Sequence, residues 1–159
     1  MNLANSWKDY KILDMSDGMK LESWNGIILS RPDPQIIWDE KTNPKLWDKT
    51  NAVYHRSNKG GGHWEYRKKL PESWTIDYRN LTFKVSPTGF KHTGIFPEQA
   101  VNWDWMYDLI SAHKDEEIRV LNLFGYTGCA TMACSAAGAQ EVVHVDASKG
   151  MVQWAKENR

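Results

Sequence analysis

A glycine turn follows a strand-like run near the end of the chain, where the sequence Val120–Gly128 reads VLNLFGYTG. A turn of this kind, between a buried strand and a helix, points backbone N–H groups at a ligand. A dinucleotide site would need the pattern G-x-G-x-x-G, because its pyrophosphate touches bare backbone, whereas Gly125 and Gly128 enclose two larger residues. A P-loop would need a Lys-Ser/Thr pair next, but Cys129 and Ala130 follow. The turn therefore favours a ligand without phosphate that presents an amino-acid end and a ribose.

A carboxylate stands at the C-terminal end of the next apolar run, Val142–Val145. Asp146 follows Gly125 by about 20 residues, a separation typical of an acid that accepts both hydroxyls of a ribose. The same residue could instead cap a helix that begins at Lys149, because Asp146 and Ser148 are both favoured N-cap types. The strand, the spacing and the glycine turn together favour the ribose interpretation.

Strand-like and helix-like segments alternate around these residues. We expect them at Ile118–Phe124, Thr127–Ala137, Glu141–Val145 and Lys149–Asn158. This β-α-β-α order implies parallel strands joined by a right-handed crossover. The predicted fold class is therefore α/β, with the beginning of a Rossmann-like domain in residues 91–159.

A further helix is expected ahead of this unit. The stretch Pro97–Gln99 places a proline and an acid in a first turn, as helix N-termini favour. The 3.6-residue period then predicts a buried apolar stripe made of Val101, Trp105, Leu109 and Ala112, with Trp103 and Met106 beside it. Trp103 and Trp105 are both expected to anchor the core.

The front of the chain is predicted to be β-rich. Hairpins are expected at Asn25-Gly26 and at Arg79-Asn80, because each pair separates two runs of strand-forming residues. We assign residues 1–90 to a small β-rich (α+β) region with a role in substrate binding.

Composition narrows the class of protein further. The 159 residues include 41% hydrophobic side chains, yet there is no run of about 18 apolar residues, and Met1–Tyr10 lacks the apolar core of a signal peptide. We therefore expect a soluble, cytoplasmic protein without membrane association. Cys129 and Cys134 do not form a CxxC pair and are predicted to be reduced thiols. No metal site is expected, because His55, His63 and Glu65 match no known ligand spacing.

The segment from His55 to Lys69 combines cations with aromatic rings. It contains one Glu and five Lys and Arg residues, which are Arg56, Lys59, Arg67, Lys68 and Lys69. Trp64 and Tyr66 lie between them in the sequence. The formal net charge of the whole chain is zero, so this is a local excess. Cations on phosphates and rings stacked on bases would suit single-stranded RNA. The alternative is a solvated loop with both rings packed inward.

Two parallel strands are few for a sheet of this type, in which five or six strands are usual. We therefore expect the chain to be the N-terminal piece of a longer protein. On its own it would leave strand edges and helix stripes uncovered, which would favour poor solubility or a homo-oligomer and no activity.

Two stretches of the sequence resemble a known family. LNLFGYTG, followed by AAGAQEVVHVDASKGMVQWAKEN, resembles class I S-adenosylmethionine-dependent methyltransferases of the branch related to the large-subunit ribosomal RNA methyltransferases. The segment Lys91–Gln99 is similar to the pattern Lys-x-Thr-Gly-x-Phe-x-Asp/Glu-Gln of that family. The specific motifs cover roughly residues 70–159, and the front half matches more loosely.

The resemblance implies roles for the matching positions. The methionine end of the cofactor, S-adenosylmethionine, would be wrapped by Asn122, Phe124, Gly125, Tyr126, Thr127 and Gly128. Asp146 would hold the ribose, and Ser148 would lie near the adenine. The other side of the cofactor would be approached by His92, Thr93, Gly94 and Phe96.

Asn122 departs from the residue usual at its position, and His92 suits two roles. Asn122 stands where many methyltransferases have an acid, so its amide would contact the cofactor's amino group with less charge attraction. His92 would equally suit a hydrogen-bonded structural role.

The implied activity is transfer of a methyl group from S-adenosylmethionine to an acceptor, with a base of ribosomal RNA favoured. The resemblance places the catalytic loop, of Asp-Pro-Pro or Asn-Pro-Pro type, beyond Arg159. Two alternatives stay open. An RNA-binding module without catalysis would suit the basic segment, and an NAD-type oxidoreductase would need the third glycine that the turn lacks.

Overall fold

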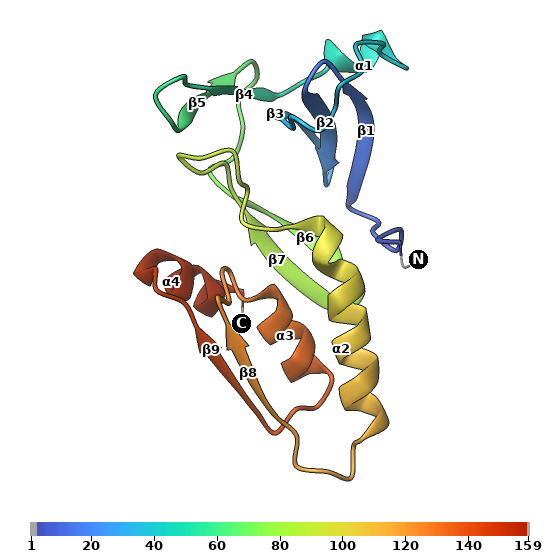
Figure 1. The fold of residues 1–159 in the computed structure, drawn as a ribbon, viewed down its shortest axis with the longest axis vertical. Helices are drawn as coiled ribbons and strands as arrows, with labels where there is room; N and C mark the ends of the chain where they lie inside the picture. Colours follow the sequence, from blue (N-terminus) through green and yellow to red (C-terminus); the bar gives the residue numbers. More distant parts are fainter. Residues whose placement is uncertain (1–2, 159) are drawn as a thin grey trace. The chain divides into compact units, whose positions relative to one another are not determined.

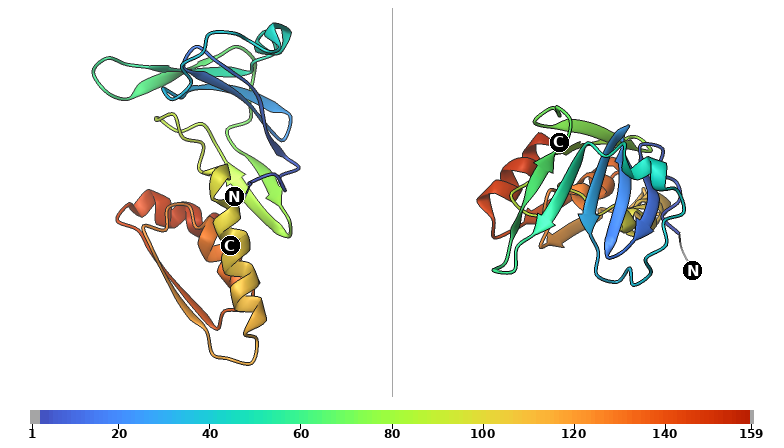
Figure 2. Two further views of the ribbon diagram at one scale, coloured as in Figure 1. Left: turned by 45° about the vertical axis from the view of Figure 1, so that its right-hand side comes forward. Right: turned by 90° about the horizontal axis from the view of Figure 1, so that it is seen from above.

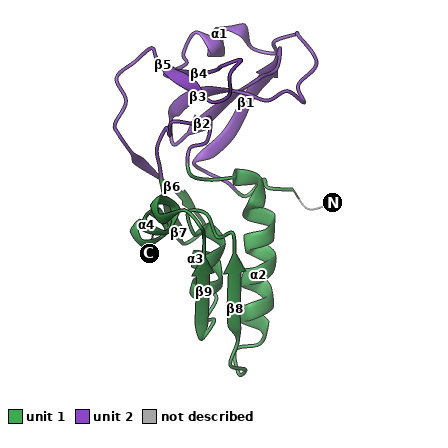
Figure 3. Cartoon of the chain, turned by 60° about the vertical axis from the view of Figure 1, so that its left-hand side comes forward, with its two compact units in different colours: residues 1–6, 77–84, 94–159 green, residues 7–76, 85–93 purple. Residues whose placement is uncertain are grey.

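The computed structural model describes residues 3–158, and the chain divides into two compact units (Figure 3). One, called here the sheet unit, consists of residues 7–76 and 85–93. The other, the Rossmann-like unit, consists of residues 1–6, 77–84 and 94–159, of which 1–2 and 159 lie outside the description. The division into residues 1–90 and 91–159 is a functional one and stays a prediction.

The sheet unit is built on five strands that lie side by side in chain order (Figure 2). They are β1 (Tyr10–Ser16), β2 (Met19–Trp24), β3 (Ile27–Pro32), β4 (Ala52–Arg56) and β5 (Gly62–Tyr66). Neighbouring strands run antiparallel except β3 and β4, which are parallel and are connected through the short helix α1 (Pro44–Trp47). Asn25 and Gly26 have φ angles of 52° and 85° between β2 and β3, as a type I′ hairpin turn requires, and this confirms the predicted hairpin.

A buried ion pair lies in the middle of this sheet. Glu22 has no exposed surface, and its two carboxylate oxygens accept hydrogen bonds from Arg31 Nε at 2.6 Å and Nη2 at 2.8 Å. The Tyr10 hydroxyl adds a third bond of 2.7 Å to the same carboxylate. Arg31 also donates to the carbonyl of Lys91 at 3.0 Å. Because a buried charge is tolerated only when it is paired and hydrogen-bonded, these contacts tie β1, β2, β3 and the Lys91 segment together.

A second buried carboxylate, Asp14 of β1, holds the segment around α1. It is 6% exposed and accepts hydrogen bonds from the backbone of Met15, Thr42 and Asn43 and from the indole of Trp47. Burial alone would raise the pKa of Asp14, but the bonds from Asn43, Trp47, Met15 and Thr42 outweigh it and lower the pKa to about 2.

The Rossmann-like unit contains two parallel strands, β8 (Arg119–Leu123) and β9 (Glu141–Val145), paired from Arg119 opposite Glu141 to Leu123 opposite Val145. Its helices are α2 (Ala100–Ala112), which continues the short 3₁₀ helix η1 (Pro97–Gln99), α3 (Cys129–Ala136) and α4 (Lys149–Glu157) (Figure 1). The alternation of strand and helix confirms the predicted α/β class.

A hairpin of β6 (Trp74–Tyr78) and β7 (Leu81–Val85) completes the elements, with Arg79-Asn80 between the strands as predicted. Its residues 77–84 belong to the Rossmann-like unit. There, the rings of Tyr78 and Phe83 lie 5.8 Å and 5.3 Å from that of Trp103 on α2.

The buried face of α2 differs from the predicted one. Trp103 is buried, as predicted, but Trp105 and Leu109, also assigned to the core, are 61% and 45% exposed, and Ile110 is buried instead. The prediction was wrong because apolar residues occur all around this helix, so that periodicity alone does not select a face. The buried face is selected instead by the contact of Trp103 with Phe83 and by the packing of Ile110 in one cluster with Cys134.

Cys129 and Cys134 are free and buried, as predicted. Within residues 3–158, no helix is both long enough and apolar enough to cross a membrane.

The low pKa of Asp14 predicts a loss of stability in acid. A lowered pKa stabilises the fold above the unfolded value of 3.8, and the contribution disappears as the pH falls toward about 2. Asp14→Asn should therefore lower the free energy of unfolding by about 2 kcal/mol at neutral pH, and its difference from the wild type should shrink in acid. Urea unfolding followed by tryptophan fluorescence, at neutral pH and in acid, measures the free energy of unfolding of both proteins.

Asp17→Asn, which changes an exposed acid three residues further on, is the control and should have little effect. A pH-independent difference between Asp14→Asn and the wild type would contradict the role of the Asp14 charge.

Candidate functional site

The glycine turn between β8 and α3 is held in a strained backbone conformation. Phe124 and Tyr126 have positive φ angles of 55° and 53°, and Gly128 has 87°. A residue with a side chain in this region costs about 1–2 kcal/mol, so the surrounding contacts must stabilise the turn. Gly125 N–H donates to the carbonyl of Val145 at 2.9 Å, and Gly128 N–H donates to that of Gly125 at 3.0 Å.

The glycines allow the turn to approach the neighbouring elements. A Cβ on Gly125 would lie 2.4 Å from Cε1 of His144 on β9, and a Cβ on Gly128 would lie 2.9 Å from that of Ala155 on α4. Contact distances this short are not tolerated, so both positions require glycine. These glycines therefore serve packing within the unit, in addition to any contact with a ligand.

Asp146 joins the turn to the start of α4. One carboxylate oxygen accepts the Tyr126 N–H at 2.9 Å, and the other accepts the Ser148 N–H at 2.8 Å. The bonds from Ser148 and Tyr126 hold the pKa of Asp146 below its usual range, so the group is ionised at neutral pH. The helix cap itself is Ser148, whose Oγ accepts the Met151 N–H at 3.4 Å. Each oxygen of Asp146 keeps a second lone pair for a ligand.

Thr127 anchors the other side of the turn. Its side chain is fully buried, its hydroxyl donates to the carbonyl of Gly94, and its own carbonyl accepts from Asn158 Nδ2 at 2.8 Å. Gly94 has a φ of 100°, and a Cβ there would lie 2.4 Å from the ring of Trp154. The Gly94 segment, the turn and α4 are thereby packed into one structure.

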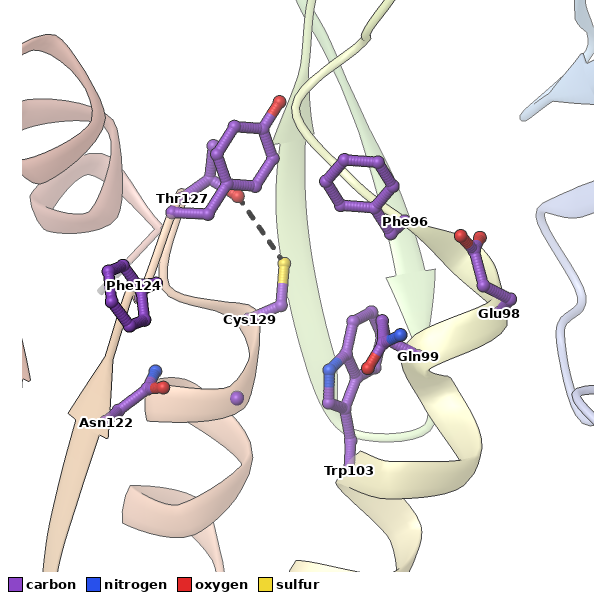
Figure 4. Close-up of a pocket in the computed structure, with 11 residues that line it drawn as sticks. Phe96, Glu98, Gln99, Trp103, Asn122, Phe124, Thr127 and Cys129 are labelled. Carbon is purple, nitrogen blue, oxygen red and sulfur yellow. Dashed lines mark hydrogen bonds between the residues drawn. The ribbon is translucent and has the colours of Figure 1, made fainter. Parts of the chain in front are cut away.

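A cavity of about 420 Å³ opens beside the turn (Figure 4), within the size range of small-molecule sites. One side is formed by η1, α2 and the residue before them: Phe96, Glu98, Gln99 and Trp103. The other side is formed by β8, the turn and α3: Asn122, Phe124, Gly125, Tyr126, Thr127, Cys129 and Ala130.

Asn122 faces this cavity from β8 with its amide already engaged. Its Nδ2 donates to Thr131 Oγ1 at 2.9 Å, and Thr131 Oγ1 lies 2.9 Å from His144 Nδ1. The amide oxygen of Asn122 therefore is the group that can accept a hydrogen bond from a ligand. Opposite it, Phe96 is 38% exposed, and its ring lies 5.3 Å from that of Tyr126.

Burial raises the pKa of the Cys129 thiol in the cavity wall to about 12, although the Thr127 hydroxyl acts in the opposite direction. The thiol is thus uncharged at neutral pH and is no nucleophile.

The structure brings together six of the twelve predicted cofactor residues in the cavity wall: Phe96, Asn122, Phe124, Gly125, Tyr126 and Thr127. Gly94, Gly128, Asp146 and Ser148 are not among the wall residues and are connected to the turn or to α4 through the contacts above. His92 and Thr93 belong to the sheet unit, where their carbonyls accept from Thr88 and Ser86.

Five wall residues were not predicted: Glu98, Gln99, Trp103, Cys129 and Ala130. Glu98 and Gln99 close the Lys91–Gln99 motif, so the motif itself carried the signal for them.

The basic segment of the sheet unit is a hairpin of β4 and β5. The five cations named above are exposed. Trp64 is half-buried and donates from its indole to the carbonyl of Thr88 at 2.8 Å, whereas Tyr66 is 57% exposed. Arg67 pairs with Glu65 at 2.9 Å, and Lys68 donates to the carbonyl of Lys49 at 2.9 Å. One ring is thus packed inward and the other is available to solvent.

The described part of the chain contains no group of three or more His, Cys, Asp or Glu side chains that could hold a metal ion.

Comparisons with known proteins agree with this geometry. The family model for S-adenosylmethionine-dependent methyltransferases matches residues 49–159. The crystal structure of the SAM-dependent methyltransferase from Agrobacterium tumefaciens superposes with a TM-score of 0.89 at 38% identity, over 96% of this chain and 48% of that one. A putative methyltransferase complexed with SAH superposes with a TM-score of 0.58 at 18% identity, over 97% of this chain and 43% of that one, which supports the fold alone.

Among curated proteins, the ribosomal RNA large subunit methyltransferase K/L of Colwellia psychrerythraea is 28% identical over 123 residues. The match covers 77% of this chain and 16% of that protein, so the chain spans only a small part of this relative. The predicted resemblance is confirmed, and the NAD-type alternative is set aside. Because the family model covers more than half of its length, the chain belongs to the S-adenosylmethionine-dependent methyltransferases.

Proposed function

We propose that this chain binds S-adenosylmethionine in the cavity beside the glycine turn and serves a methyltransferase that acts on RNA, with a base of ribosomal RNA as the acceptor. The observation that carries the proposal is the turn itself. It is bonded to the ionised Asp146 on one side and opens on a cavity of about 420 Å³ on the other.

The chemistry of the cavity fits this cofactor. None of the eleven described residues that line it is Lys, Arg or His, which suits a ligand without phosphate. The amide oxygen of Asn122 suits an ammonium group, and the free lone pairs of Asp146 suit the two hydroxyls of a ribose.

The roles that we propose are those that the family resemblance implies. Asn122 and the residues from Phe124 to Gly128 hold the methionine end, Asp146 holds the ribose, and Ser148 lies near the adenine. Phe96 approaches from the η1 side, and Gly94 acts through Thr127. His92 and Thr93 keep the role that the family motif implies.

When bound, S-adenosylmethionine supplies an electrophilic methyl group whose transfer removes a positive charge from sulfur. The contribution of this chain is to bind and orient. The contacts of Gly125 with His144 and of Thr127 with Gly94 fix the turn before any ligand arrives, which reduces the entropy lost on binding.

The RNA partner is supported by the β4–β5 hairpin and by the name of the curated relative. Arg56, Lys59, Arg67, Lys68 and Lys69 would contact phosphates. Trp64 would hold the hairpin in shape, while Tyr66 offers an exposed ring for stacking on a base.

Self-association and a cytoplasmic location stay predictions. The β8–β9 sheet supports self-association, because exposed apolar side chains share one of its faces: Leu121, Leu123, Val143 and Val145.

The ribose role of Asp146 gives a measurable expectation. Asp146→Ala should weaken S-adenosylmethionine binding about tenfold to a hundredfold, because it removes charge-assisted hydrogen bonds. Calorimetric titration, with a thermal melt of each variant, measures affinity and stability separately.

The matched control is Asp104→Ala, because Asp104 is also a hydrogen-bonded carboxylate, with partners Tyr78 and Arg79 outside the cavity wall. Asp104→Ala should lower the melting temperature and leave the affinity for S-adenosylmethionine unchanged. If Asp146→Ala melted early but bound the cofactor normally, Asp146 would be a structural residue only. Binding of NAD in place of S-adenosylmethionine by the wild type would overturn the cofactor assignment.

The RNA proposal predicts a salt effect. Replacing Arg56, Lys59 and Lys69 by Ala should weaken binding of a single-stranded ribosomal RNA oligonucleotide and reduce the slope of log affinity against log salt by about 2, or roughly 0.7 per lost phosphate contact. Fluorescence anisotropy over a salt series measures the slope.

Replacing three exposed lysines elsewhere in the sheet unit, Lys8, Lys11 and Lys45, removes the same charge and serves as the control. Equal losses in the two triple variants would mean that the hairpin is no RNA site. RNA binding by a chain that does not bind S-adenosylmethionine would favour the RNA-binding module without catalysis.

A further inference from the structure

The cavity wall carries a single formal charge. Of the eleven residues that line it, Glu98 is the only Asp, Glu, Lys, Arg or His. The Cys129 thiol is kept neutral by burial, and the amide of Asn122 is neutral and donates to Thr131. A cation in this cavity would therefore meet one carboxylate, and that carboxylate comes from η1.

The placement of Glu98 suits this role. Figure 4 shows it on the η1 side of the cavity beside Phe96, across from Asn122 on β8 and Phe124 in the turn that follows. Its side chain is exposed, so the carboxylate can turn toward a ligand. The neutral Asn122 leaves the strand side of the cavity without an acid.

The alternative is a role in helix stability. Glu98 lies in the first turn of η1, directly before α2, where an acid interacts favourably with the helix dipole. That role would affect the melting temperature and would leave ligand affinity unchanged.

We propose that Glu98 is the counter-ion of the bound cofactor, an inference that rests on the proposed function. S-adenosylmethionine has one positive charge more than its demethylated product, because only its sulfur is a sulfonium. A carboxylate in the cavity therefore binds the cofactor more tightly than the product, so the affinity for the ligand falls when the methyl group is transferred. Glu98 thus sets the preference for cofactor over product and favours product release.

The test compares two ligands on three variants. Calorimetric titration of wild type, Glu98→Gln and Glu98→Asp with S-adenosylmethionine and with S-adenosylhomocysteine gives six affinities. Glu98→Gln should weaken S-adenosylmethionine binding about threefold to tenfold and S-adenosylhomocysteine binding much less, and Glu98→Asp should keep most of the wild-type preference. Added salt should reduce the difference between wild type and Glu98→Gln by screening.

Asp108→Asn is the control, because it removes an exposed acid from α2 outside the cavity wall and should change neither affinity. If Glu98→Gln weakened both ligands equally or neither, or only melted earlier, the counter-ion role would be overturned while the proposed function stood. Absence of S-adenosylmethionine binding by the wild type would instead refute the proposed function.

Discussion

The site depends on how closely the turn after β8 approaches β9. Gly125 has no side chain, so the His144 ring occupies the space where a Cβ would lie, and the Gly125 N–H reaches the carbonyl of Val145 at 2.9 Å. One residue further on, the Tyr126 N–H reaches Asp146 at 2.9 Å. The contacts that hold the two parallel strands together therefore also fix the residues that would meet the ligand. A larger residue at Gly125 would change the fold and the site at once.

Charge is distributed unevenly around this fixed turn. Asp146, at the end of β9, has its ionised form stabilised by two backbone N–H groups, while the strand residue Asn122 is neutral and bonded to Thr131. The remaining carboxylate, Glu98, enters from η1. The cavity wall thus combines the last residues of the Lys91–Gln99 motif with residues of the glycine turn.

The parts of the fold that follow local rules could be predicted from the sequence. Asn25-Gly26 specifies its hairpin through backbone preference, and β9 appears with its predicted bounds because a short apolar run is bounded by Gln140 and Asp146. The buried face of α2 could not be predicted in full, since apolar residues occur all around the helix and contacts with Tyr78 and Phe83 select Trp103 over Trp105. Strand β5 was also missed, because the glycines before it and its exposed polar residues resemble a loop, and pairing with β4 defines it. For the site, the sequence motif named the turn residues that line the cavity, whereas the position of Glu98 in the same wall is visible only in the folded chain.

The most direct test of the central claim is to locate the bound cofactor on the isotopically labelled chain by NMR titration with S-adenosylmethionine. The account predicts that the largest amide shifts occur at Phe96, at Gly125 and its neighbours up to Cys129, and at Ser148, while the β4–β5 hairpin stays unchanged. Shifts that avoid the glycine turn, or that gather on the sheet unit, would contradict it.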